Sequence, residues 1–241
     1  MNAASVGNDI KVKRLIEKGA NINIGRATPL LYASKNGHTK VVKLLIEKGA
    51  KINIKLDDHG ATPLHWASKN GHLEVVKLLL LRGLDRTINV QDIEGADINV
   101  LGDDGATPLH WAIMKGHTEV VHYLIDSGAD INLPDDDGAT PLHWAIMKGL
   151  TGVLKVVKLL IENGAKISLS DSGGNTPFKL IQDGKTEFEE ILKKITAKAT
   201  PIGGKKTTRK KRIRKPKTAK KQIKNQRNKK QESKKSRKRN K

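Results

Sequence analysis

The 241-residue chain contains no cysteine, which excludes disulfide bonds and cysteine-based metal or redox chemistry. It also lacks any run of 18 apolar residues and any charged-then-apolar N-terminal pattern, so neither a membrane span nor Sec-type export is expected. We expect an intracellular protein, located in the cytoplasm, or in the nucleus if it acts in a eukaryotic cell.

Recognisable catalytic patterns are missing as well. The sequence has no glycine-rich phosphate loop, and no nucleophile, base and orienting acid can be assembled from it. We therefore expect no enzymatic activity, no cofactor and no metal site.

What the chain does contain is an internal repeat. The heptapeptide Ala-Thr-Pro-Leu-His-Trp-Ala starts at Ala61, Ala106 and Ala139, and looser copies start at Ala27 and Asn175. The Thr-Pro pairs begin at positions 28, 62, 107, 140 and 176, which gives intervals of 34, 45, 33 and 36 residues. A period of about 33 residues is the signature of stacked helical units.

Each unit is predicted to be a helix, a turn, a second helix and a hairpin-like loop. Thr62 can cap the first helix through its hydroxyl, and Pro63 takes the first helical position, where its missing N–H costs nothing. The second helix, at 75–80, is apolar on more than one face, as expected for a helix between neighbours. Glycine is the usual terminator of such helices, and it follows them here at Gly49, Gly83, Gly128 and Gly164.

With this motif the chain resembles ankyrin-repeat proteins over residues 1–199. The resemblance implies an all-α solenoid of five to six repeats, in which stacking of neighbours supplies the stability. The approximate boundaries are 1–25, 26–59, 60–104, 105–137, 138–173 and 174–199. The first repeat is incomplete, and the last is degenerate, with a charged second helix at 187–194 that suits a terminal cap.

The 45-residue interval contains twelve extra residues. In it, the stretch from Gly83 to Val90 is nearly repeated from Gly95 to Val100. The insertion is expected in the loop region, where added length costs little.

Histidines recur at two slots and suggest a metal site. Because stacked helices lie about 8–10 Å apart, His65, His110 and His143 are too widely spaced to share one metal ion. The resemblance instead implies that they form hydrogen bonds near the capping threonine and tie the repeats together. The same structural role is predicted for the histidines that begin the second helices, His38, His72 and His117.

Tryptophan recurs at one further slot, in Trp66, Trp111 and Trp144. These rings could form an aromatic ladder for a ligand or pack in the core. Core packing is favoured, because the resemblance implies a large apolar residue at this slot.

The resemblance also implies that partners bind to the hairpin tips and to the inner face of the first helices, which form a concave surface. The corresponding tip positions are Asp57, Asp58, His59, Asp103, Asp104, Asp135, Asp136 and Asp137. The corresponding helix positions are Lys35, Asn36, Lys69, Asn70, Met114, Lys115, Met147 and Lys148. We expect a monomeric, non-catalytic scaffold for a protein partner that the sequence does not identify.

The composition changes completely at residue 200. Residues 201–241 contain 21 lysines and arginines and one acid, Glu232, for a net charge of +20, against +1 for residues 1–200. With no aromatic and few apolar residues, the segment 200–241 is expected to be a disordered tail. Such a tail attracts polyanions without base specificity, so the alternative function is a nucleic-acid-associated protein that acts mainly through this tail.

Two clusters in the tail resemble nuclear-import signals, one short and one in two parts. The residues concerned are Lys210, Lys211, Arg212, Arg214, Lys220, Lys221, Lys234, Lys235, Arg237, Lys238 and Arg239. Import, polyanion binding and a contact with the acidic hairpin tips of the same molecule all stay open. Attachment to an anionic membrane is less favoured, because no lipid anchor can assist it.

Overall fold

The computed structural model describes residues 2–25, 28–55, 60–80, 95–148 and 153–184, which all belong to one unit, Met1–Ala199. Within these ranges every regular element is a helix and no strand occurs, which confirms the all-α prediction. In the same ranges, no helix is long and apolar enough to span a bilayer.

The helices come in pairs, one pair for each repeat. The first helices of the pairs are α1 (Asn2–Ser5), α3 (Pro29–Lys35), α5 (Pro63–Lys69), α7 (Pro108–Lys115), α9 (Pro141–Lys148) and α11 (Pro177–Gly184). The second helices are α2 (Asp9–Glu17), α4 (Thr39–Glu47), α6 (Leu73–Leu79), α8 (Thr118–Asp126) and α10 (Val153–Glu162). The partner of α11, predicted at 187–194, lies outside the described residues.

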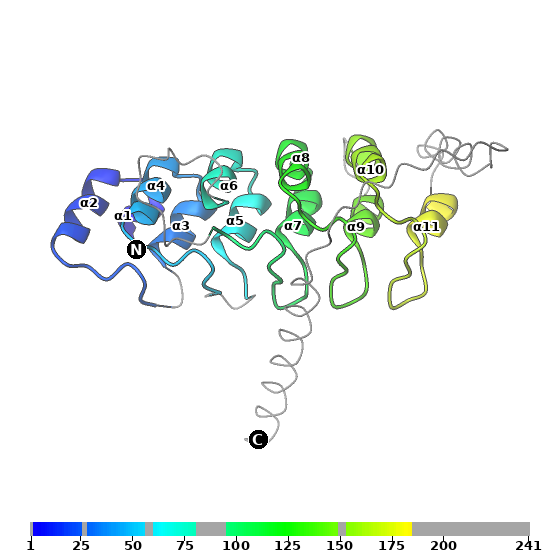
Figure 1. Ribbon diagram of the computed structural model, residues 1–241, viewed down its shortest axis with the longest axis horizontal. Helices are drawn as coiled ribbons and strands as arrows, with labels where there is room; N and C mark the ends of the chain where they lie inside the picture. Colours follow the sequence, from blue (N-terminus) through cyan, green and yellow to red (C-terminus); the bar gives the residue numbers. More distant parts are fainter. Residues whose placement is uncertain (1, 26–27, 56–59, 81–94, 149–152, 185–241) are drawn as a thin grey trace, which may run out of the picture. The chain divides into compact units, whose positions relative to one another are not determined.

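The paired helices of this unit form two layers (Figure 1). In one layer each odd-numbered helix packs against the next, from α1 to α11, and in the other layer each even-numbered helix does the same, from α2 to α10. The loops that join one pair to the next descend on the side of the odd-numbered helices. The odd-numbered helices are therefore the layer nearer to the loop tips.

Local sequence explains where the helices begin and end. The hydroxyl of Thr28 accepts a hydrogen bond from the N–H of Leu31 at 3.3 Å, and a proline follows each capping threonine at the first helical position. After the second helices, Gly49, Gly128 and Gly164 adopt φ values of 79°, 93° and 94°, which confirms the predicted glycine terminators. Gly83, the fourth predicted terminator, lies outside the described residues.

The core lies between the two helix layers. One leucine from each of α3, α5, α7 and α9 occupies the same slot and is almost completely buried, namely Leu30, Leu64, Leu109 and Leu142. The second helices contribute a valine pair, except that the first repeat has exposed Lys11 where the next has buried Val41. Each repeat thus buries its apolar side against its neighbours, as a stacked array requires.

The backbone shows how the repeat resumes after the insertion. The N–H of Ala96 donates to the carbonyl of Leu79 at 2.8 Å, which is the bond that Ala50 makes with Leu45 one repeat earlier. The side chain of Asn53 also bridges to this segment, since its amide donates to the carbonyl of Gly95 at 3.1 Å and its oxygen accepts from the N–H of Asp97 at 2.9 Å. The second copy of the duplicated stretch therefore continues the stack.

Candidate binding face

Buried histidines fix the spacing between neighbouring first helices. In His65, His110 and His143, Nδ1 accepts from the N–H of the capping threonine at 3.2, 3.1 and 3.0 Å. Because Nδ1 accepts, the proton is on Nε2, which donates across the repeat boundary to the carbonyls of Ala106, Ala139 and Asn175 at 3.1, 3.3 and 3.0 Å. The predicted structural role of these histidines is confirmed.

These bonds require a neutral imidazole. Burial lowers the pKa of His110 to about 4, with a smaller opposing effect from its hydrogen bond to the Ala139 carbonyl. In the described ranges, no three histidine or acidic side chains come close enough to hold a metal ion.

The second set of histidines also connects repeats. Nε2 of His38, His72 and His117 lies 2.7, 3.0 and 3.0 Å from the carbonyls of Ser5, Lys35 and Lys69 in the preceding repeats. Two residues predicted for partner binding share in this junction, because the amide of Asn36 donates to Ser5 at 2.8 Å and that of Asn70 donates to Lys35 at 2.6 Å. Both asparagines are exposed, but their amides already hold the array together.

The hairpin tips form a row along the side of the first helices. In each of the described hairpins from Gly102, Asp135 and Asp171, the first residue donates its N–H to the carbonyl four residues later, at 2.8–3.0 Å. Adjacent tips are linked as well: the N–H of Asp136 donates to the Asp104 carbonyl at 3.0 Å, and that of Ser172 to the Asp137 carbonyl at 2.8 Å. The predicted tip residues Asp57, Asp58 and His59 lie outside the described residues.

Asp135 differs from the other acidic tip residues because it is only 8 % exposed. One carboxylate oxygen accepts from the N–H groups of Asp137 and Ala139 at 3.0 and 2.8 Å, and the other accepts from the Trp144 indole at 2.8 Å. Burial raises the pKa of this carboxyl group, and the three hydrogen bonds oppose that rise. Asp135 therefore shapes its hairpin. Asp103, Asp104, Asp136 and Asp137 are exposed at the tips, where the carboxylate of Asp104 also accepts from the N–H of Ala106 at 3.0 Å.

Lysines cover the first two tryptophans. The Trp66 and Trp111 rings meet edge-on with centroids 5.5 Å apart. The Lys35 ammonium lies 4.1 Å from the Trp66 centroid, and that of Lys69 lies 4.7 Å from Trp66 and 4.6 Å from Trp111. The rings pack with Ala61 and Ala106 in a small apolar cluster, which supports the packing role.

A pocket opens beside the third tryptophan. Its volume is about 400 Å³, and its walls include Asp135, Asp137, Trp144, Met147, Lys148 and Asp171. Four of these residues were predicted from the sequence to bind a partner, whereas core packing was favoured for Trp144 and Asp171 was not assigned. Asp171 could have been found by alignment with Asp135, because both begin the same kind of hairpin.

The other residues of the first helices that were predicted to bind a partner differ in exposure. Lys115, Met147 and Lys148 are exposed, and Met147 retains 65 % of its accessible surface. Met114 is half-buried, like Lys35 and Lys69. The predicted tail residues from Lys210 to Arg239 lie outside the described part of the chain.

Comparison with protein families gives a match. The family described as ankyrin repeats (3 copies) matches residues 1–92 and 85–171, and the two matches overlap within the insertion. Repeats of this kind are generally protein-interaction modules and typically have no catalytic activity. No significant match is found among curated proteins.

Proposed function

The chain belongs to the ankyrin-repeat family, with a match over residues 1–171, and from this premise we propose that it is a non-catalytic scaffold for a protein partner. The proposed contact surface, called here the binding face, consists of the hairpin tips and the adjoining side of α3, α5, α7 and α9. Its described members are Lys35, Asn36, Lys69, Asn70, Asp103, Asp104, Met114, Lys115, Asp136, Asp137, Met147 and Lys148.

One observation carries this proposal. The histidines, capping threonines and Asn53 use their polar groups to bind one repeat to itself or to the next. In contrast, the side chains of Lys115, Lys148 and Asp137 are exposed and form no hydrogen bond with the described residues. These three side chains do not hold the repeats together and are accessible to a partner. The exposed Met147 adds an adaptable apolar contact.

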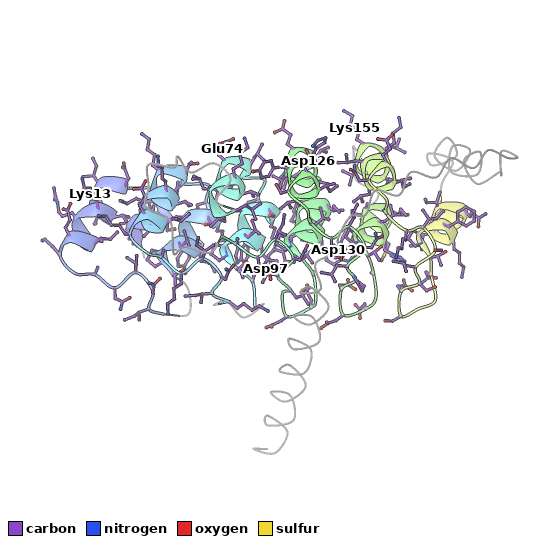
Figure 2. All side chains as sticks on the ribbon, in the orientation of Figure 1. Lys13, Glu74, Asp97, Asp126, Asp130 and Lys155 are labelled. Carbon is purple, nitrogen blue, oxygen red and sulfur yellow. The ribbon has the colours of Figure 1, made fainter. Side chains whose placement is uncertain are left out.

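The proposal is tested by a matched pair of charge reversals in the full-length protein. One variant carries Lys115→Glu and Lys148→Glu on the binding face. The control carries Lys43→Glu and Lys155→Glu on α4 and α10, where Lys155 projects on the side away from the hairpins (Figure 2). All four lysines are exposed, so both variants should fold and both lose the same charge.

Each protein is used to capture partners from cells of its source, with and without nuclease. We expect the binding-face variant to lose the captured protein while the control variant retains it. Equal capture by both variants would place the interface elsewhere, and capture that requires nucleic acid would favour the alternative function.

We propose as a second function that residues 201–241 bind polyanions, such as nucleic acid, or direct the protein to the nucleus. The net charge of +20 on this segment is the observation that favours it. A reporter fused to 201–241 in a eukaryotic cell should concentrate in the nucleus, and replacing Lys210, Lys211, Arg212 and Arg214 by alanine should reduce the effect. A cytosolic reporter would rule out import and leave polyanion binding to be measured separately.

A further inference from the structure

Lysine ammonium groups lie over the rings of Trp66 and Trp111, the first two tryptophans of the row. The ring of Trp144, the third, has no such lysine among the described residues. Three residues after Trp66 comes Lys69, whose ammonium lies over both Trp66 and Trp111. Three residues after Trp111 and Trp144 the chain has methionine instead, at Met114 and Met147. Among the described residues, no lysine or arginine lies over the Trp144 ring.

The same tryptophan borders open space. Its ring meets His110 edge-on at 5.3 Å between centroids, and it also lines the pocket of about 400 Å³. The row of aromatic residues ends here, because the equivalent slot in the next repeat holds Leu180. A pocket of this size accommodates a long side chain together with part of its backbone.

The pocket is also acidic. Asp135, Asp137 and Asp171 line it, and Lys148 is the one basic residue among the described residues of its walls. The carboxylates of Asp135 and Asp171 are held in place, since each accepts hydrogen bonds from two backbone N–H groups of its own hairpin. Asp137 is exposed, and its carboxylate accepts no hydrogen bond from the described residues. The preceding hairpin has Gly102 in place of Asp135 and so lacks this carboxylate.

We propose that this pocket binds the side chain of an arginine in an extended segment of the partner protein. The arginine would fill the open cation position beside Trp144 and place its guanidinium among the three carboxylates. Arginine fits better than lysine, because its planar, weakly hydrated guanidinium stacks on aromatic rings and forms bidentate hydrogen bonds with carboxylates. An acidic or purely apolar side chain would leave the carboxylates without a counter-charge. This inference rests on the proposed function and names the partner chemistry for one part of the binding face.

The test requires no partner. The chain has three tryptophans and hence three indole N–H signals in a nitrogen-correlated NMR spectrum. The full-length protein is titrated with N-acetyl-arginine-N-methylamide, and the same measurement is made with the citrulline analogue, which has almost the same shape and no charge. The Trp144 signal is identified by its loss in a Trp144→Phe variant.

We expect the Trp144 signal to move with the arginine compound, with a dissociation constant on the order of 1 mM for so small a probe. The signals of Trp66 and Trp111, which the protein's own lysines cover, should stay in place. The citrulline compound should produce little change.

A matched pair of variants tests the role of the carboxylates. Asp137→Asn removes a pocket charge without removing a hydrogen bond of the hairpin, and it should weaken binding about two- to fivefold. Asp126→Asn makes the same charge change on α8, outside the pocket, and should leave binding unchanged (Figure 2).

Three results would overturn the proposal. The first is a Trp144 signal that does not respond to the arginine compound, and the second is one that responds equally to citrulline. The third is a response that occurs only after residues 201–241 are replaced by a neutral Gly/Ser sequence of equal length, because the occupant would then be the protein's own basic segment. None of these results bears on partner capture, so the scaffold function stands or falls by its own experiment.

Discussion

At the scale of single residues, the same side chain can join repeats and set the conditions under which the array is stable. His110 is buried, accepts from its own capping threonine and donates to the next repeat. Protonation would put a hydrogen on Nδ1, where the Thr107 N–H already points. The hydrogen bonds and the burial therefore both require the neutral ring.

This requirement predicts that the array loses stability in mild acid. The pKa of His110 is about 4 in the folded protein, below the usual value of 6.5, so the unfolded chain binds more protons between these values. The stabilisation that neutral His110 contributes is fully present above pH 6.5. It is lost as the pH falls to 4, which lowers the free energy of unfolding by roughly 3 kcal/mol.

Denaturant unfolding at a series of pH values measures this loss. A His110→Gln variant is the control, because it lacks the His110 imidazole and keeps every other titrating group of the parent protein, including Asp135. The free energy of unfolding should fall less steeply between pH 6.5 and 4 in the variant than in the parent. Parallel curves for the two proteins would contradict the assignment.

At the scale of the helix pair, glycine serves two different purposes. Gly71 lies between α5 and α6 with φ 75°, and a Cβ there would come within 2.6 Å of Nδ1 of His117 in the next repeat. Gly128 follows α8 with φ 93°, and a Cβ there would meet nothing within 4 Å. The first glycine allows a close contact between repeats, whereas the second only ends a helix.

The two glycines form a matched pair for mutation. Gly128→Ala should cost about 1 kcal/mol, the strain of a side chain at positive φ. Gly71→Ala should cost that amount and a further 1–3 kcal/mol, because the His117 ring must move and its bond to the Lys69 carbonyl is disturbed. Thermal unfolding of both variants measures the difference, and equal losses would show that the ring adapts freely.

At the scale of the whole molecule, charge is divided sharply along the chain. Residues 1–200 carry a net charge of +1 and residues 201–241 carry +20. Attraction to nucleic acid should therefore depend on the second segment and be strongly screened by salt.

We expect weak binding of the full-length protein to duplex DNA, without sequence preference. The logarithm of the affinity should fall linearly with the logarithm of the salt concentration. Replacing the lysines and arginines of 201–241 by glutamine should abolish most of the binding, as measured by fluorescence anisotropy. Binding that survives this replacement would assign the DNA contact to the repeats.

How far the sequence predicts this molecule depends on the range of the interaction. Helix starts at Thr28 or Thr107 were predictable from a short motif that recurs in register, and the hydrogen-bonding role of His110 from the family resemblance that this motif carries. The pocket depends on two hairpins about one repeat apart and on Leu180 ending the aromatic row, which no local motif contains. The hydrogen bond from the amide of Asn70 to the carbonyl of Lys35 in the preceding repeat likewise lies beyond any local motif.

The duplicated stretch between α6 and α7 has an evolutionary consequence. The framework hydrogen bonds of this junction are made by the copy that starts at Gly95, through Ala96 and through Asn53. Purifying selection for foldability should then act on 95–100. In descendants of this gene, Asn53 should therefore be retained and changes of length between Gly95 and Val100 should be rare, because either change would break these bonds.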